Sequence, residues 1–155
     1  MAKKPTTADA ELILKLYDLR REAEIRKARN WWLGFWPDSA DDVVKVAMAL
    51  GTQENAWLRQ VGGYWEMAAS LANHGVISSE LFLEPSFSGE MIFIFAKVYP
   101  FLKELREKMN SPTLFSNVEK LIMSSKKGKE TLAMIQKRQA ELRKRAAEAA
   151  RAKAS

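Results

Sequence analysis

The chain has 155 residues, of which 47% are hydrophobic and 28% charged, a size and composition typical of one globular domain. It contains no cysteine, which excludes disulfide scaffolds, cysteine-based zinc or iron–sulfur sites and thiol nucleophiles. No apolar run approaches the roughly 20 residues of a membrane span, and the charged start lacks the apolar segment of a signal peptide. We therefore expect a cytoplasmic protein without a membrane span.

The net charge of +6 is unevenly distributed along the chain. Residues 31–102 carry a net charge of −5, whereas residues 103–155 carry +8. Such an asymmetry is typical of a chain with an anionic partner. It is equally typical of basic ends that are attracted to the acidic middle of the same chain, or of a solvated helix.

The first expected helix covers residues 8–33. Leu12, Leu16, Leu19 and Ala23 follow one another at helical spacing, and Thr7 is a suitable N-cap. Gly34 and Pro37 then prevent the helix from continuing. The aromatic corner, residues 31–37, therefore lies at the end of this helix and in the bend that follows.

Two further helices have clear start and stop signals. Ser39 and Asp42 resemble a capping box, and Gly51 is the expected stop of the short helix that follows. Thr52 is the expected N-cap of a longer helix, which Gly75 ends.

Two glycines, Gly62 and Gly63, lie in the interior of this longer helix. Glycine costs about 1 kcal/mol relative to alanine in such a position. We expect the pair to allow close approach of a large neighbour such as Trp36.

The second half of the chain is also expected to be helical. Ser78 precedes a short helix, and residues 89–110 form a longer one with a kink near Pro100. The run "MIFIF" within it could be a buried strand, but no other segment offers it a strand partner, so helix is favoured. Residues 113–124 form another helix, and residues 125–128 a polar linker.

Residues 130–155 follow a different pattern, with apolar or small residues three and four positions apart. This heptad-like seam consists of Leu132, Ile135, Leu142, Ala146 and Ala149, with the polar Gln139 at one of its positions. About three repeats are the lower limit for a coiled coil. The seam could pair with the first helix or with a second copy of itself, and the end beyond Arg145 is rich in alanine, lysine and arginine, a composition that tends to fray.

These patterns predict an all-α fold, a compact bundle of about six helices with a long basic C-terminal helix. The expected division is a disordered N-terminus at residues 1–7, a helical domain at 8–124 and a basic helical tail at 125–155.

Few residues suggest chemistry, and none is assigned a catalytic, cofactor-binding or metal-binding role. His74 is the only histidine and lies at the end of a helix, where a partial positive charge is favoured. Glu66 lies on a strongly apolar helix, where a structural pair with Arg59 is favoured over acid–base work. An enzyme or small-ligand site would require Glu66 and His74 to converge in a pocket with Trp65.

Two candidate interaction surfaces emerge. Trp31, Trp32 and Trp36 of the aromatic corner are favoured as core residues, with an oligomer interface, a membrane surface or a ligand as alternatives. The basic tail is favoured as a solvated helix surface, and the alternatives are a protein partner or nucleic acid or another polyanion bound without sequence preference. The residues expected to bind a polyanion are Lys137, Arg138, Arg143, Lys144 and Arg145.

Three segments, "DAELILKLYDLRREAEIRKAR", "GYWEMAASLANHGVISSELFLE" and "GEMIFIFAKVYPFLKELREKMNSP", resemble conserved hypothetical proteins of acidobacteria. More distantly, they are similar to a bacterial helical domain of unknown function with a Tyr-Trp-Glu motif. The matching positions are Tyr64, Trp65, Glu66, Gly75, Arg106 and Pro112. The resemblance implies an all-α fold over residues 9–125 and no assigned activity.

The leading hypothesis is a non-catalytic helical interaction or scaffold protein that self-associates as a homo-oligomer or binds a protein partner. Its interface would use Leu132, Ile135 and Leu142 of the seam together with exposed members of the aromatic corner. A basic adaptor for nucleic acid or another polyanion is the alternative, and a small-ligand binder or enzyme is the third.

Overall fold

The computed structural model describes residues 3–154 and, within that range, contains nine α-helices and one 3-10 helix but no β-strand. The all-α prediction is confirmed. None of the helices in this range combines the length and the apolar character that a membrane span requires. In chain order the elements are α1 (Thr7–Leu19), α2 (Ala23–Gly34), α3 (Ala40–Met48), α4 (Gln53–Asn73), α5 (Ser79–Phe82), α6 (Pro85–Val98), η1 (Tyr99–Phe101), α7 (Leu102–Lys108), α8 (Ser116–Met123) and α9 (Lys126–Ala154).

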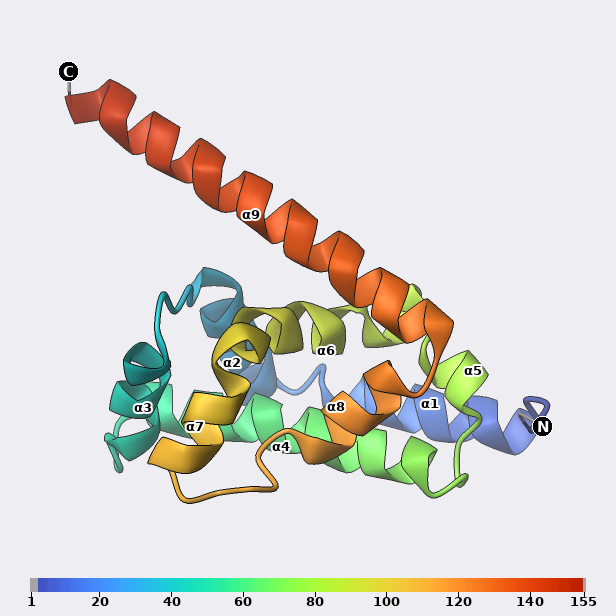
Figure 1. Cartoon of the computed structure of the whole chain (residues 1–155). Helices are drawn as coiled ribbons and strands as arrows, with labels where there is room; N and C mark the ends of the chain where they lie inside the picture. The colour runs from blue at the N-terminus through green and yellow to red at the C-terminus, as the bar shows by residue number, and fades with distance from the viewer. Residues whose placement is uncertain (1–2, 155) are drawn as a thin grey trace.

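Helix α4 is the centre of the bundle, and α2, α3 and α8 pack against it (Figure 1). Helix α6 lies across α8, and α9 crosses both α6 and α8 before it leaves the bundle (Figure 1). The largest fully buried side chains include Trp32 of α2, Trp65 of α4 and Phe95 of α6. The core therefore forms where these three helices meet.

The predicted caps of α3 and α4 are confirmed. The Ser39 hydroxyl accepts from the Asp42 amide at 3.3 Å, and the Asp42 carboxylate accepts from the Ser39 amide at 3.1 Å. The Thr52 hydroxyl likewise accepts from the Asn55 amide at 3.3 Å. Gly75 follows α4 with a φ of +71°, a left-handed conformation that favours glycine.

The single helix expected at residues 8–33 is wrong, because the chain turns at Arg20 and forms α1 and α2. Arg20 is buried, and its Nη1 donates to the Phe87 carbonyl of α6 at 2.9 Å. Glu22 starts α2 by accepting from the amides of Glu24 and Ile25. The turn also leaves Leu19 exposed, so the expected apolar stripe does not continue into α2.

The start of α1 differs from the prediction by one residue. Thr6, and not Thr7, is the N-cap, and it forms a capping box with Asp9. Asp9 is buried and also accepts from the Ser78 amide at 2.7 Å, which ties α1 to α5. The Thr6 hydroxyl and then the Ser78 amide lower the pKa of Asp9 to about 2. Of the segment 1–7 that was expected to be disordered, residues 1 and 2 lie outside the described residues.

The helical prediction for "MIFIF" is confirmed, since Met91, Ile92, Ile94 and Phe95 are buried within α6. The predicted kink near Pro100 is also present: α6 ends at Val98, and the 3-10 helix η1 separates it from α7.

The polar linker expected at residues 125–128 is wrong, because α9 begins at Lys126. The Ser125 hydroxyl accepts from the Gly128 amide at 2.9 Å at the start of the helix. Gly128 is buried against α8, and a Cβ at this position would lie 2.2 Å from the Ile122 carbonyl oxygen. A glycine is therefore required for α9 to turn this closely over α8.

The neighbour expected at Gly62 and Gly63 also differs. A Cβ on Gly62 would lie 3.5 Å from the Phe115 ring, whereas one on Gly63 would have no neighbour within 4 Å. Trp36 lies elsewhere, against Phe93 of α6.

Candidate interaction sites at the aromatic corner, α9 and Glu66

The aromatic corner packs largely within the chain. Trp32 is completely buried, whereas Trp31 and Trp36 are half-buried. Trp31 stacks on Phe35 with ring centroids 4.7 Å apart, and Trp36 meets Phe93 edge to face at 5.8 Å. Much of the aromatic surface at the end of α2 is therefore covered by rings of the same molecule.

Lys97 of α6 is the polar centre of this corner. Its side chain is buried, and Nζ donates to the carbonyls of Trp32 at 2.5 Å, Leu33 at 3.1 Å and Phe35 at 2.8 Å. These carbonyls lie at the end of α2, where helical acceptors lack partners within the helix. Nζ also lies 4.0 Å from the centroid of the Trp36 ring. Lys97 therefore joins α6 to the C-terminus of α2.

The position of Lys97 changes its protonation. Burial, and next the positive charge of Arg143, lower the pKa of Lys97 from 10.5 to about 7. The group is thus partly neutral near physiological pH, unlike an exposed lysine.

Arg143 of α9 closes the corner from the other side. Its Nη1 contacts Asp38 at 2.5 Å, and its Nη2 donates to the Pro37 carbonyl at 2.8 Å. Its guanidinium carbon also lies 5.2 Å from the centroid of the Trp36 ring. Trp36 is therefore in contact with two basic side chains, one from α6 and one from α9.

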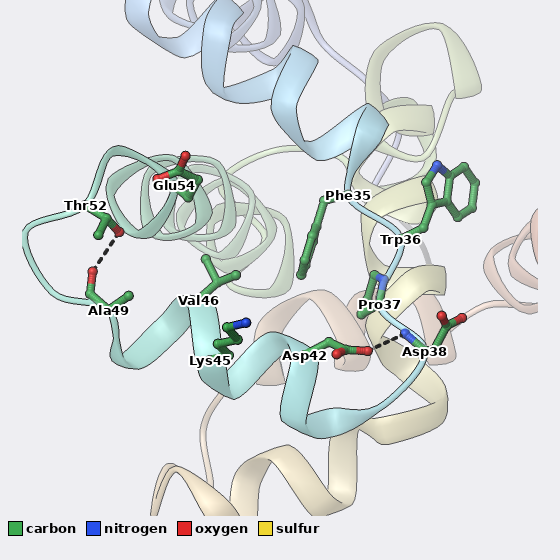
Figure 2. A pocket seen from close by; sticks show the side chains of 10 residues that line it. All are labelled: Phe35, Trp36, Pro37, Asp38, Asp42, Lys45, Val46, Ala49, Thr52 and Glu54. Atoms are coloured by element: carbon green, nitrogen blue, oxygen red, sulfur yellow. Dashed lines mark hydrogen bonds between the residues drawn. The ribbon is translucent and has the colours of Figure 1, made fainter.

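A groove of about 510 Å³ runs beside the corner, between α3 and the start of α4 (Figure 2). Its apolar lining comprises Phe35, Trp36, Pro37, Val46 and Ala49. Its charged lining comprises Asp38, Asp42, Glu54 and Lys45. Three carboxylates against one ammonium give the groove an acidic character, which opposes an anionic ligand there.

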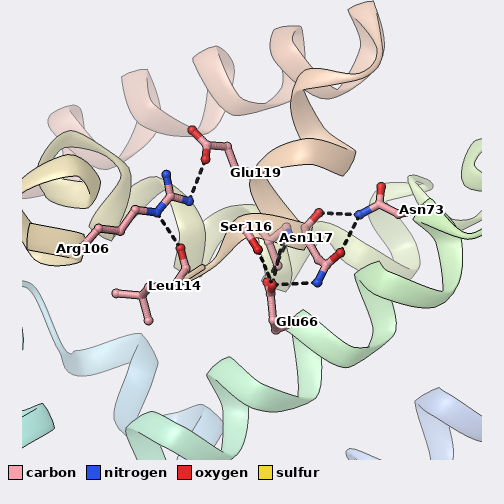
Figure 3. Close-up of polar contacts among 8 residues, drawn as sticks. Glu66, Asn73, Arg106, Leu114, Ser116, Asn117 and Glu119 are labelled. Atoms are coloured by element: carbon pink, nitrogen blue, oxygen red, sulfur yellow. Dashed lines mark hydrogen bonds and ion pairs between the residues drawn. The ribbon is translucent and has the colours of Figure 1, made fainter. Parts of the chain in front are cut away.

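Glu66 caps the N-terminus of α8 (Figure 3). Its Oε1 accepts from the amide of Asn117 at 2.7 Å, from Asn117 Nδ2 at 3.0 Å and from the Ser116 hydroxyl at 3.4 Å. Its Oε2 accepts from the Val118 amide at 3.1 Å. The carboxylate thus occupies the place where helix N-termini favour negative charge. Arg59, the partner expected from the sequence, donates instead to Asn55 at 3.0 Å.

Trp65, Glu66 and His74 are directed toward different partners. The indole Nε1 of Trp65 donates to Glu90 of α6 at 3.2 Å, whereas Glu66 contacts α8. The exposed His74 is the C-cap of α4, and its Nδ1 lies 2.8 Å from the Ser70 carbonyl oxygen. The structure does not bring the three side chains together.

The seam residues are divided between the interior and the surface. Leu132 and Ile135 are buried where α9 crosses α6 and α8, and Gln139 Nε2 donates to the Phe93 carbonyl at 2.8 Å. Leu142 is 43% exposed. Residues 144–154, here named the free end of α9, are all exposed and helical (Figure 1). Residue 155 lies outside the described residues.

Four of the five predicted polyanion-binding residues are exposed, namely Lys137, Arg138, Lys144 and Arg145. Within the described residues none of the four forms an ion pair. Arg143 differs, because it forms an ion pair with Asp38. In residues 3–154 no group of three or more His, Asp or Glu side chains is placed to hold a metal ion.

Residues 5–125 match the family described as "Domain of unknown function (DUF4760)", and the chain belongs to this family. No curated protein and no solved structure matches the chain. The match ends one residue before α9 begins, so this helix lies outside the family domain although its first half packs against it.

Several residues that carry the sequence resemblance join two elements of the domain. The Tyr64 hydroxyl donates to the Leu16 carbonyl of α1, and Glu66 caps α8. Arg106 of α7 donates to the Leu114 carbonyl at 3.0 Å and pairs with Glu119 of α8 at 2.7 Å (Figure 3). Burial of Tyr64 raises the pKa of its hydroxyl to about 12.

Sequence reasoning missed Lys97 and Glu90 as polar centres. Glu90 pairs with Arg29 at 2.6 Å in addition to accepting from Trp65. One signal was present for Lys97, because it is the only charged residue in the run from Met91 to Phe101, and a lone lysine in such a run needs buried acceptors.

Proposed function

We propose that the protein is a non-catalytic interaction protein, in which the DUF4760 domain holds a basic helix that binds an anionic polymer, with nucleic acid as the favoured partner. The observation that carries the proposal is the division of α9 into a docked half and an exposed, cationic free end. We expect the protein to act in the cytoplasm.

The fixed position of α9 supports this role. Leu132, Ile135 and Gln139 pack against α6 and α8, and Arg143 is anchored at Asp38. The free end therefore continues a helix whose direction is already set. A helix held in advance loses less conformational entropy on binding than a disordered tail.

The composition of the free end favours phosphate contacts over apolar ones. It carries Lys144, Arg145, Arg151 and Lys153 against Glu148, a net charge of +3 over eleven residues. Its apolar residues are all alanine, and it has no aromatic side chain for base stacking. Binding would thus be electrostatic, independent of sequence and strongly dependent on salt.

The test measures fluorescence anisotropy of labelled duplex DNA and RNA at several salt concentrations. We expect the full chain to bind at low salt with an affinity that falls steeply as salt rises. A variant with Lys144, Arg145, Arg151 and Lys153 all changed to glutamine should bind more weakly. A plot of the logarithm of its binding constant against the logarithm of the salt concentration should also be less steep. The slope should fall by about 0.9 for each phosphate that the variant no longer neutralises.

A matched control changes four exposed cations outside α9 to glutamine, namely Lys4, Lys15, Arg21 and Arg26. It removes the same net charge but leaves α9 intact. Equal weakening in both variants would contradict a role for the free end and indicate attraction by net charge alone. If the chain binds heparin but neither DNA nor RNA, the partner would be a polyanion other than nucleic acid.

Self-association is the second candidate, favoured by the exposed continuation of the seam. Leu142, Ala146 and Ala149 extend the buried row of Leu132 and Ile135 onto the surface. Two copies could pair along this row. Because Leu132 and Ile135 already pack within the chain, the self-associating face would depend on Leu142.

Salt distinguishes the two candidates. Each free end carries a net charge of +3, so screening should strengthen pairing between copies and weaken binding to a polyanion. Light scattering should therefore show a mass that rises with salt and falls in Leu142→Ala. A monomer of 17.6 kDa at all salt and protein concentrations would contradict self-association.

A further inference from the structure

A separate cavity of about 280 Å³ lies between α4 and the segment that joins α7 to α8. Its apolar lining comes from both sides and includes Leu58, Met109, Leu114 and Phe115. Arg59, Gly62, Gly63 and Glu66 of α4 also line it. Gly62 and Gly63 follow Arg59 by three and four positions and precede Glu66 by four and three, so all four lie on one face of the helix. No residue of α9 takes part, so this site is independent of the interaction proposed above.

The two glycines open the cavity on its helix side. Both are interior residues of α4, where glycine is unfavourable relative to alanine. Packing does not require a glycine at Gly63, because a Cβ there would have no neighbour within 4 Å. At Gly62 the Phe115 ring, at 3.5 Å from the Cβ position, would be in ordinary contact. The absence of side chains at these positions therefore leaves space rather than permitting a close helix contact.

The hydrogen-bonding capacity of the two charged lining residues differs. Glu66 already accepts from four donors of α8, which matches the roughly four acceptor sites of a carboxylate. Arg59 donates from Nε to Asn55, and within residues 3–154 its Nη1 and Nη2 form no hydrogen bond. Among the described residues that line the cavity, the terminal nitrogens of Arg59 are thus the only charged donors without a partner, and the hydroxyls of Ser111 and Thr113 also line it.

Asn55 holds Arg59 in position. It is completely buried, and its Nδ2 donates to the carbonyls of Val46 at 3.1 Å and Ala47 at 2.8 Å, at the end of α3. Its Oδ1 is consequently fixed as the acceptor for Arg59 Nε at 3.0 Å. The guanidinium therefore stands at the rim with its Nε side anchored and its paired terminal nitrogens available.

We propose that this cavity binds a small apolar carboxylate, with the carboxylate held bidentately by Arg59 and the apolar body against Phe115 and Gly63. A planar guanidinium with two free nitrogens is the protein group best matched to a carboxylate. At roughly 30 Å³ per water-sized unit, the volume accommodates about nine or ten non-hydrogen atoms. An aryl or medium-chain acid fits this size, whereas a nucleotide does not.

The test titrates the full chain, labelled with ¹⁵N, with phenylacetate and octanoate, and uses phenylacetamide as the neutral isostere. We expect saturable amide shifts at Gly62, Gly63 and Phe115 with the acids. The amide should bind at least tenfold more weakly. Arg59→Gln should weaken binding of the acids by about 10- to 100-fold, as expected for loss of a charge-assisted pair.

Gly63→Leu fills the cavity and leaves its polar groups unchanged, so it should abolish binding while the remaining amide spectrum stays native. Arg21→Gln removes an exposed arginine that does not line the cavity and should bind the acids like the unchanged chain. Equal affinity for acid and amide, or unchanged affinity in Arg59→Gln, would overturn the assignment. So would the absence of saturable shifts at the lining residues with either acid.

Discussion

At the scale of single residues, buried or half-buried polar side chains connect helix ends that are far apart in sequence. Lys97 supplies donors to the C-terminus of α2, and Glu66 supplies acceptors to the N-terminus of α8. Asp9 supplies acceptors to two helix N-termini, since its carboxylate accepts from the Thr6 amide at the start of its own helix and from the Ser78 amide at the start of α5. Helix ends leave backbone groups without partners, and these side chains satisfy some of them while fixing the relative positions of the helices.

Stability should depend on pH through Lys97. Its folded-state pKa of about 7 lies below the ordinary 10.5. Between these values the unfolded chain binds more protons, so the free energy of unfolding should rise with pH across this window. The test is chemical denaturation of the unchanged chain and of Lys97→Met at about pH 6 and about pH 9. The free energy of unfolding of the unchanged chain, relative to that of Lys97→Met, should be higher at about pH 9 than at about pH 6. A constant difference would contradict this assignment.

Loss of the Glu66 carboxylate should destabilise the domain. Glu66→Ala leaves the donors at the start of α8 without their acceptor, which costs about 1–3 kcal/mol. Urea denaturation provides the measurement. Glu80→Ala, on an exposed side chain of α5, is the control and should have little effect. Equal stability of the two variants would argue against capping by Glu66.

At the scale of elements, the sequence was sufficient where the signals are local. The caps at Ser39 and Thr52, the stop at Gly75 and the kink at Pro100 depend on residues within a few positions of each other. The break between α1 and α2 was not predictable in this way. It contains no glycine or proline, and it depends on the hydrogen bond of Arg20 with Phe87, 67 residues away.

The same distinction explains what was missed at the candidate sites. The acceptors of Lys97 are backbone carbonyls 62 to 65 residues away. Because every residue has a backbone carbonyl, the sequence does not indicate which of them accept from a lysine. The pairing of Arg59 with Glu66 was expected because they share a helix face, but Asn55 and α8 offered each a better placed partner. The spacing in the sequence correctly predicted that Arg59 and Glu66 share a face of α4. It could not indicate that Asn55 and the start of α8 would be their partners.

Replacing either of two helical glycines by alanine should change the free energy of unfolding, but in opposite directions. Gly63→Ala adds a Cβ into open space and should raise the free energy of unfolding by about 1 kcal/mol. Gly128→Ala places its Cβ 2.2 Å from the Ile122 carbonyl oxygen and should destabilise by about 1–3 kcal/mol. Paired chemical denaturation curves would measure both. A stabilising Gly128→Ala would contradict the close packing of α9 on α8.

At the scale of the whole molecule, the boundary of the family domain and the boundary of the packed core do not coincide. The family match ends at residue 125, yet Leu132, Ile135 and Gln139 of α9 are buried against the domain. The division of the chain at residues 124 and 125 stays a prediction. The structure nevertheless indicates that the first half of α9 covers apolar surface of α6 and α8.

Two truncations should separate the roles of the two halves. A chain that ends at Arg143 keeps every buried residue of α9 and should unfold at the same temperature as the full chain. A chain that ends at Ser125 loses the cover of Leu132 and Ile135 and should unfold at a lower temperature. Calorimetry measures both. Equal melting temperatures for all three chains would show that α9 adds nothing to the core.

The contact of Arg143 with the aromatic corner also has a mechanical consequence. The free end extends the helix by roughly 16 Å beyond this residue, at 1.5 Å per residue. A sideways force on the tip of the helix would be transmitted as a torque to the point where α9 is held. The contact of Arg143 with Asp38, which lies 105 residues away in sequence, would be loaded first. The strain would pass next to Trp36 and so to the packing around Lys97.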